Sequence, residues 1–173
     1  MSTKKPINKY VLIGNVCVVY TSKREKFLVD ADKYELIKNI SWHFDNKGYV
    51  TGNITINKKQ HKVRLHRFIT NCPENMVVDH INGDKSNNRM CNLRICSVKE
   101  NIYNSGIQKR NTLNAKGVSM THSGTYQAQI QVDGKLKYLG SYKTIKEASD
   151  AYDLAAKKYF GKFAKLNNYT NIS

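Results

Sequence analysis

Apolar and polar residues alternate in short segments along the N-terminal part of the chain, which predicts strands separated by turns. Residues 10–20 are mostly β-branched or aromatic on both sides of a Gly-Asn pair, a pattern typical of two short strands joined by a tight turn. Residues 48–57 alternate in the same way, and residues 61–65 have the composition of a further strand. We therefore expect a hairpin at the start of the chain and more strands after it.

A short helix is expected between these strands, at residues 30–40. Apolar residues recur there at the spacing of one helical face, and Asp30 stands where an N-cap residue would accept a hydrogen bond from the first turn. Trp42 and Phe44 follow this segment, and we expect both in the core rather than stacked on a ligand.

The C-terminal part of the chain has the pattern of a small sheet followed by one helix. Asp133-Gly134 is a pair whose positive φ angles suit a hairpin turn between two strands. Thr144 and Glu147 then form a capping box, and apolar residues recur at helical spacing until Gly161 ends the helix. One helix is therefore expected to cover one sheet. The expected strands are residues 117–120, 125–132 and 135–142.

Residues 77–104 show a different order: a strand, a long polar loop, a second strand and a helix. A second capping box at residues 97–100 opens that helix and places Asn101 in its first turns. Asn101 can then point back to the end of the first strand, where Asp79 and His80 lie. A carboxylate and an amide suit a hard cation such as Mg²⁺, and a histidine can accept a proton from water near neutral pH. Together they suit a one-metal phosphodiesterase.

The run VDHINGDKSNNRMCNLR at residues 78–94, followed by KEN, resembles the HNH motif of phage and intron-encoded homing endonucleases. This resemblance implies a ββα-metal fold in which His80 is the general base and Asp79 and Asn101 bind one divalent ion beside the scissile phosphate. It gives Asn92 the supporting role of holding the loop and orienting the base. Asn101 stands where many members have histidine, which favours Mg²⁺ or Mn²⁺ over Zn²⁺.

Leu65-His66-Arg67 resembles an element that recurs just ahead of this motif in the same family, where it packs near the active site. His66 and Arg67 are therefore secondary catalytic candidates. The residues alone favour a simpler interpretation, in which the histidine is buried and the arginine binds a backbone phosphate or a carboxylate.

Residues 116–167 resemble a second family, the Apetala2-type DNA-binding domain. The matching segments include KGV at 116–118, YLG at 138–140 and AYD at 151–153. Alternation in the second strand of this region places alanine, isoleucine and valine toward the helix and a row of glutamines on the opposite face. Glutamine can pair with adenine in the major groove, although solvent exposure accounts for the row as well. Several arginines of the family are absent here. The family's base- and phosphate-contacting positions fall on Lys116, Ser119, Thr121, Gln129, Gln131 and Tyr138.

The net charge of +16 narrows the choice of partner. Residues 1–105 carry 18 Lys/Arg against 9 Asp/Glu, and residues 106–173 carry 11 against 4, so both halves are basic. Such a charge favours a polyanion, and we expect double-stranded DNA as the partner. The sequence has neither an apolar run that would span a membrane nor an apolar signal peptide, so we expect an intracellular, cytoplasmic protein without membrane contact.

Cysteine spacing bears on the choice of metal. The four cysteines contain no close C-x-x-C pair, which is typical of ordinary thiols in a reducing compartment. A structural zinc site of Cys72, Cys91 and Cys96 matches no strong pattern and is not expected, although the residue types leave it open. The expected cofactor is one divalent ion, Mg²⁺ or Mn²⁺.

The two resemblances divide the chain into an HNH domain at 1–104, a basic linker at 105–115, an Apetala2-type domain at 116–167 and a tail at 168–173. The linker can lie along the DNA backbone or be a merely solvated tether. Further basic residues that we expect to contact DNA are Arg67, Arg89, Arg94, Lys109 and Arg110.

We therefore predict an α+β protein in which a ββα-metal nuclease domain precedes a three-stranded antiparallel sheet packed on one helix. The predicted activity is site-directed hydrolysis of DNA, by a homing-type nickase or double-strand cutter. One motif gives one cut, so a double-strand break requires a dimer or two sequential events, and monomer or homodimer stays open. The main alternative is a DNA-binding regulator without cleavage activity, and a zinc-stapled RNA-binding protein is a third interpretation.

Overall fold

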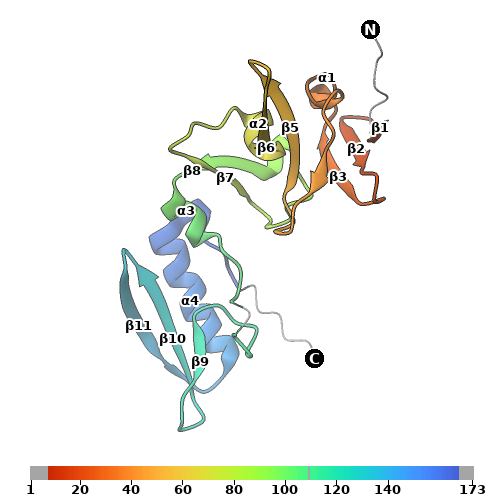
Figure 1. Cartoon of the computed structure of the whole chain (residues 1–173). Coiled ribbons are helices and arrows are strands. Elements are labelled where there is room, and N and C mark those ends of the chain that lie inside the picture. The colour runs from red at the N-terminus through yellow and green to blue at the C-terminus, as the bar shows by residue number, and fades with distance from the viewer. Residues whose placement is uncertain (1–7, 109, 168–173) are drawn as a thin grey trace. The chain divides into compact units, whose positions relative to one another are not determined.

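The computed structural model describes residues 8–108 and 110–167. The chain divides into two compact units, Met1–Val98 and Lys99–Ser173 (Figure 1). Both units combine small antiparallel sheets with few helices, so the fold is of the mixed class that the alternating pattern predicts.

The first sheet is an antiparallel meander of β1 (Lys9–Ile13), β2 (Val16–Tyr20) and β3 (Lys26–Asp30). The turn between β1 and β2 is made by Gly14, whose φ of +56° suits glycine, together with Asn15. Inward-facing side chains alternate along β2 and β3 and are buried in the core. The predicted opening hairpin is therefore confirmed.

The prediction of a helix at residues 30–40 with Asp30 as its N-cap was wrong in the helix's length and in its cap. The structure has a 3-10 turn, η1 (Ala31–Lys33), followed by a single turn of α-helix, α1 (Tyr34–Ile37). The Asp30 side chain makes no capping hydrogen bond. Its carboxylate instead accepts hydrogen bonds from Arg89 Nε at 2.9 Å and from Met90 N at 2.7 Å. A contact distant in sequence thus replaces the local cap.

The second sheet has three antiparallel strands and is followed directly by a helix: β4 (His43–Phe44), β5 (Val50–Ile56), β6 (Lys59–Arg64) and α2 (Leu65–Thr70). Trp42, which precedes β4, is 1% exposed and lies in the core as predicted, with Phe44 packed against that core. The backbone N–H of Trp42 donates to Asn8 Oδ1 at 2.8 Å, and Asn8 Nδ2 donates to the Trp42 carbonyl at 2.9 Å. This reciprocal pair satisfies a buried amide and fixes the chain ahead of β4.

The third sheet consists of β7 (Val77–His80) and β8 (Leu93–Cys96), and α3 (Val98–Tyr103) follows it. The polar loop between the two strands contains a 3-10 turn, η2 (Met90–Asn92). The predicted order of strand, loop, strand and helix is confirmed. Residues from Lys99 onward belong to the second unit, where the Tyr103 ring of α3 stacks on Phe160 at a centroid distance of 3.9 Å.

The second unit contains a sheet in the order β11-β10-β9, formed by β9 (Val118–Met120), β10 (Tyr126–Val132) and β11 (Lys135–Tyr142). Both residues of the Asp133-Gly134 turn have positive φ angles, +53° and +76°, as a two-residue hairpin turn requires. Ala128 and Ile130 are buried, while the glutamines that alternate with them lie on the opposite face. The three predicted strands are confirmed.

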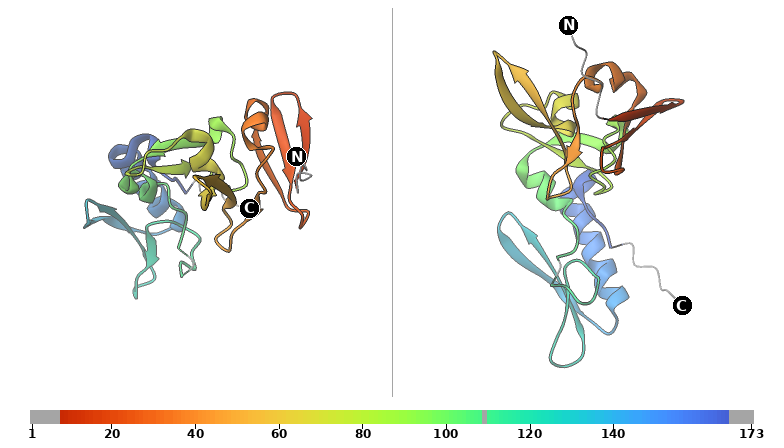
Figure 2. Two further views of the ribbon diagram at one scale, coloured as in Figure 1. Left: turned by 45° about the horizontal axis from the view of Figure 1, so that its top comes forward. Right: turned by 45° about the vertical axis from the view of Figure 1, so that its right-hand side comes forward.

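One face of this sheet is covered by α4 (Ile145–Phe160), which Figure 2 shows in blue beside the cyan strands. Its predicted capping box is present: Glu147 N donates to Thr144 Oγ1 at 3.2 Å, and Thr144 N donates to the Glu147 carboxylate at 3.1 Å. Gly161, with a φ of +52°, ends the helix as expected. Across residues 8–108 and 110–167, no helix is long and apolar enough to cross a membrane.

Gly117, just before β9, is the most closely packed glycine of the second unit. Its φ is +73°, and a Cβ built there would lie 2.6 Å from the Gln129 carbonyl oxygen and closer still to the Tyr152 ring. We expect Gly117→Ala to lower the free energy of unfolding by about 2–4 kcal/mol. Backbone strain at the positive φ and overpacking against the Tyr152 ring both contribute to this loss. Urea unfolding followed by circular dichroism measures this change.

The matched control is Gly124→Ala. Gly124 has a similar φ of +78°, but no atom lies within 4 Å of a Cβ at that position. The free energy of unfolding of Gly124→Ala should fall only by the cost of backbone strain, about 1 kcal/mol. Equal losses in the two variants would show that the contact with Tyr152 does not restrict residue 117.

Candidate active site

The candidate site is built at the end of β7, where Asp79 and His80 are adjacent. In the antiparallel pairing with β8, Asp79 lies opposite Arg94 and His80 lies opposite Leu93. Both side chains are buried, each with 5% exposure. Charged and titratable groups are rarely buried without partners, so their contacts determine what they can do.

The His80 ring is held by a buried amide. His80 Nε2 lies 3.3 Å from Oδ1 of Asn88, a residue with 0% exposure. The amide orientation follows from its other end, because Asn88 Nδ2 donates to the carbonyls of Lys85 at 3.1 Å and Ser86 at 3.3 Å. Oδ1 is an acceptor only, so Nε2 carries the proton, and a neutral His80 has its lone pair on Nδ1.

The surroundings of His80 favour its neutral form. Burial lowers the pKa of His80, and the positive charge of Lys85 acts in the same direction. The hydrogen bond to Asn88 and the charges of Asp79 and Asp84 oppose this shift and are outweighed. A neutral histidine with a defined tautomer is what a general base at neutral pH requires.

Asp79 is oriented by a forked interaction with Arg94. Nε and a terminal nitrogen of Arg94 lie 2.7 Å and 2.6 Å from Asp79 Oδ2. Both side chains are largely buried, and two charge-assisted hydrogen bonds to one oxygen hold Oδ2 in place. Arg94, expected on sequence grounds to contact DNA, is therefore placed beside the candidate metal ligand.

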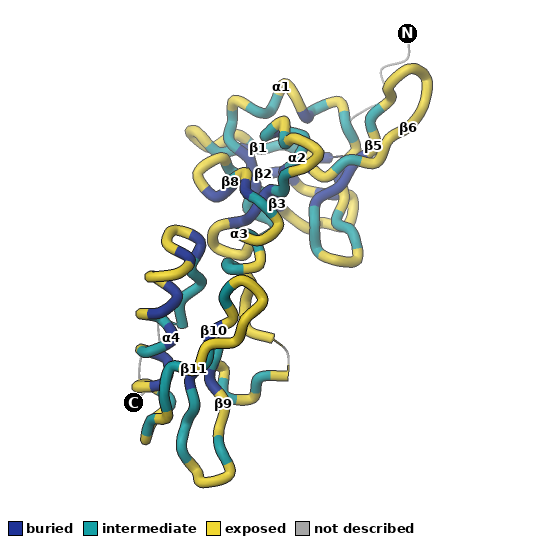
Figure 3. The backbone as a smooth tube through the Cα atoms, turned by 90° about the vertical axis from the view of Figure 1, so that its left-hand side faces the viewer, coloured by how far each residue is buried: buried dark blue, intermediate teal, exposed yellow. Residues whose placement is uncertain are grey.

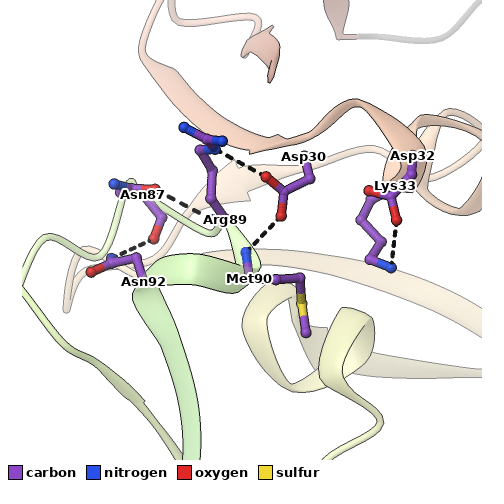
Figure 4. A network of polar contacts seen from close by, with 7 residues as sticks. All are labelled: Asp30, Asp32, Lys33, Asn87, Arg89, Met90 and Asn92. Carbon is purple, nitrogen blue, oxygen red and sulfur yellow. Dashed lines mark hydrogen bonds and ion pairs between the residues drawn. The ribbon is translucent and has the colours of Figure 1, made fainter. Parts of the chain in front are cut away.

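The loop between β7 and β8 is closed by Asn92. Its Oδ1 accepts a hydrogen bond from Asn82 N at 3.1 Å, and its Nδ2 donates to the Asn87 carbonyl at 2.8 Å. Figure 4 shows Asn87 and Asn92 beside Arg89, whose Nε donates to Asp30 of β3. Arg89, another expected DNA contact, thus ties the loop to the first sheet.

An aromatic cluster surrounds His80. The His66 ring of α2 meets the His80 ring edge-on at 5.1 Å, and the Tyr49 ring lies 5.3 Å from His66 and 6.2 Å from His80. His66 is 4% exposed, and its Nδ1 has no hydrogen-bond partner. Burial, followed by the charges of His80 and Arg64, lowers the pKa of His66 to about 3. His66 is therefore a neutral neighbour of the candidate base.

Arg67, the other secondary candidate, supports the backbone. Its guanidinium donates to the carbonyls of Met76 at 2.6 Å, Pro73 at 2.9 Å and Cys72 at 3.3 Å. These bonds fix the segment that leads from α2 into β7. Arg67 thus binds backbone carbonyl groups, whereas the sequence suggested a phosphate or a carboxylate as its partner.

Asn101 lies half-buried on α3, in the second unit, and Asp79 lies in the first. The two side chains supply carboxylate and amide oxygens, the donor types that hard divalent ions take in proteins. Among the residues that the structure describes, no three His, Cys, Asp or Glu side chains form a group that could hold a metal ion. Cys72, Cys91 and Cys96 form no disulfide bond within the part of the chain that the structure describes.

Four of the expected DNA contacts in the second unit share the face of the sheet opposite α4. Gln129 pairs with Tyr138 across the sheet, Gln127 pairs with Ser119, and Gln131 follows on the same side of β10. Thr121 instead lies in the turn after β9, bonded to Thr125.

The remaining expected contacts are placed differently. Lys116 is partly buried, its Nζ donates to the carbonyls of Tyr103 and Ser105, and burial lowers its pKa to about 8. Arg110 is exposed and donates to Gln108. Lys109 lies outside the described residues.

Sequence reasoning missed Asn88 and Tyr49. Asn88 stands inside the quoted motif, where the paired asparagines were a visible signal, but its burial and its contact with His80 come from folding. Tyr49 reaches the site from the position just before β5, and no local pattern marks it.

Residues 64–103 match a family model described as HNH endonuclease. An uncharacterized HNH endonuclease of Acanthamoeba polyphaga mimivirus is 30% identical over 145 residues, which cover 80% of this chain and 73% of that protein. A second uncharacterized HNH endonuclease of the same virus is 26% identical over 154 residues, covering 86% of this chain and 41% of that protein. A solved structure, of DNA binding and cleavage by the HNH homing endonuclease I-HmuI, matches with 21% identity, a TM-score of 0.37 and 82% coverage of each chain.

The buried His66 makes stability depend on pH. Its pKa is about 3 in the folded protein and near 6.5 when exposed, so the unfolded chain binds the proton more readily. The His66 contribution to stability is intact above about pH 6.5 and is lost as pH falls toward 3, by at most about 1.4 kcal/mol per pH unit. The variant His66→Phe keeps a ring without this titration. Urea unfolding at several pH values should show wild type losing stability relative to the variant below about pH 6.5. Parallel curves would mean that His66 is not buried neutral.

Proposed function

This chain belongs to the HNH endonuclease family, and we propose that it hydrolyses phosphodiester bonds of double-stranded DNA with His80 as the general base. The observation that carries the proposal is the buried His80 ring, whose Nε2–H is held by Asn88 while its pKa is lowered. The net charge of +16 supports a nucleic-acid substrate, because basic side chains bind phosphates with release of counterions.

In the proposed reaction, a water molecule in line with the bond to the 3′ oxygen attacks the phosphorus. Nδ1 of His80 takes a proton from this water as the new P–O bond forms, and the bond to the 3′ oxygen breaks. The departing 3′ oxygen takes a proton from solvent water, so the products are a 5′-phosphate and a 3′-hydroxyl end. Asn88 Oδ1 keeps its bond to Nε2 throughout, so it orients the ring and stabilises the imidazolium that forms.

Asp79 and Asn101 are the residues that we propose hold one divalent ion, Mg²⁺ or Mn²⁺. Their oxygen donors fit a hard cation, and the fork from Arg94 orients the Asp79 carboxylate as outer-shell partners of metal ligands commonly do. When bound, the ion supplies charge stabilisation at the phosphorus and at the departing oxygen.

The second unit is proposed to hold the DNA in register. The face with Ser119, Gln129, Gln131 and Tyr138 supports this role, because amide side chains can read base edges in the major groove. We propose an Apetala2-type domain at residues 116–167, joined through residues 105–115 to the nuclease domain. One motif cuts one strand, so a homing-type monomer would nick and a dimer would break both strands.

The decisive experiment is cleavage of supercoiled plasmid by wild type and His80→Ala with Mg²⁺ or Mn²⁺. Loss of the base should slow cleavage by about 10²–10⁴-fold. Treatment with EDTA should abolish wild-type cleavage, and added Mg²⁺ or Mn²⁺ should restore it.

Asp79→Ala is the companion variant, because the added ion should fail to restore its activity while DNA binding by gel shift persists. Equal cutting by wild type and His80→Ala would remove His80 from the mechanism. Tight DNA binding by wild type without cleavage under any divalent ion would favour a DNA-binding regulator.

The Asn88→Asp variant tests the role of the amide. A carboxylate beside Nε2 stabilises the imidazolium and raises the pKa of His80, so the base is protonated at higher pH than in wild type. The acid limb of the kcat profile should therefore move to higher pH, by roughly one unit. Asn39→Asp adds the same charge at an exposed position of the first unit and is the control. A variant with reduced kcat but an unmoved acid limb would assign Asn88 a purely structural role.

A further inference from the structure

The β5–β6 hairpin extends beyond the sheet that contains it. β4 pairs only with Val50 and Thr51, so from Gly52 to the tip the hairpin has two strands in the part of the chain that the structure describes. Asn57 and Lys58 form the tip with φ angles of +51° and +64°, and the surrounding side chains are exposed. Figure 3 shows the tip in yellow at the edge of the first unit.

The two faces of this hairpin differ in chemistry. Cross-strand partners share a face, and successive pairs alternate between the two faces. One face presents Thr51 opposite Arg64, Asn53 opposite Lys62, and Thr55 opposite Gln60. The other presents Gly52 opposite Val63, Ile54 opposite His61, and Ile56 opposite Lys59. Asn53, Thr55, Gln60, Lys62 and Arg64 are all exposed, and we call them the polar face of the hairpin.

The face opposite the polar face packs against the core at the base of the hairpin. The polar face therefore points away from the core there. A Cβ at Gly52 would lie 2.8 Å from Ile40 Cγ2 and 2.9 Å from Trp42 Cε3. The side of the strand that carries Gly52 is therefore pressed against the core at that point. The polar face, which alternates with it, is turned away from these residues.

The polar face continues into the candidate active site. The Arg64 guanidinium lies over the Tyr49 ring at 4.5 Å from its centroid, and Lys85 Nζ lies 4.2 Å from the same centroid. Tyr49 is the aromatic neighbour of His66 and His80. A row of polar side chains thus leads along the hairpin to a cationic group beside the proposed base.

Charge on this segment has one sign. No acidic residue occurs between Asp45 and Glu74, and Lys58, Lys59 and Lys62 lie at or near the tip. All three lysines are exposed. Exposed cations on a narrow two-stranded ribbon complement phosphates, and the major groove of DNA is wide enough to admit such a ribbon.

We propose that the β5–β6 hairpin enters the major groove of double-stranded DNA beside the cleaved bond, with the amides of its polar face toward the bases. The lysines and Arg64 bind phosphates, and the amides of Asn53 and Gln60 reach base edges, where such side chains can pair with adenine. This inference rests on the proposed function, since it places the hairpin on the substrate of the same site. It adds a DNA-reading surface to the first unit.

The first test is the salt dependence of DNA binding by the full chain, measured by anisotropy on a labelled duplex of random sequence. The variant Lys58→Gln/Lys59→Gln/Lys62→Gln should reduce the slope of log K against log salt by about 2–3, roughly 0.9 for each phosphate that the variant no longer neutralises. The control is Lys9→Gln/Lys23→Gln/Lys26→Gln, which removes the same charge from exposed positions on the first sheet and in its β2–β3 turn. Its slope should stay close to that of wild type.

The second test is cleavage-site mapping on a randomised DNA pool with wild type and Asn53→Ala/Gln60→Ala. The double variant should lose base preference at one or two positions beside the cut and keep the others. Equal slopes for the two lysine variants, or an unchanged preference after loss of both amides, would overturn the hairpin's role while wild type still cuts. A wild type that binds DNA but never cuts would overturn the proposed function, and the slopes would still report on the hairpin.

Discussion

Asn88 is completely buried, and its amide joins the histidine of β7 to the loop that follows that strand. Nδ2 is used by two carbonyls of the loop, so Oδ1 faces the ring of His80. A buried amide left without a partner costs about 1–3 kcal/mol, so a change in the loop and a rotation of the ring each carry this cost. The conformation of the loop and the tautomer of His80 are therefore coupled through one side chain.

The loop in turn depends on the first sheet. Leu28 of β3 donates its N–H to the Ser86 carbonyl and accepts a hydrogen bond from Asn88 N, at 2.9 Å and 2.8 Å. Asp30, at the end of the same strand, binds Arg89 and the N–H of Met90. The loop is thus held by hydrogen bonds to β3, the last strand of the N-terminal meander. This accounts for a part of the chain that carries no recognisable catalytic residue.

Local patterns predicted most of the elements, because strand alternation, turn pairs and capping boxes are properties of neighbouring residues. The Asp133-Gly134 turn and the Thr144 cap are examples. The prediction that Asp30 caps a helix was wrong because its carboxylate bonds to residues about sixty positions away in the sequence, which no local pattern shows. In the candidate site, the motif identified His80, but no spacing rule could place Tyr49 beside it. A single sequence does not predict which distant residues tertiary packing brings into contact.

A strongly basic protein can lower the pKa of a buried histidine pair and also attract phosphates. Burial is the largest cause of the lowered pKa of both His66 and His80, and nearby cations such as Arg64 and Lys85 add to it. A phosphate that reaches the Tyr49 cluster would neutralise part of the cationic contribution but none of the contribution from burial. Cations near the Tyr49 ring, such as Lys85, can then bind a phosphate while burial, the larger cause, still lowers the pKa of the proposed base.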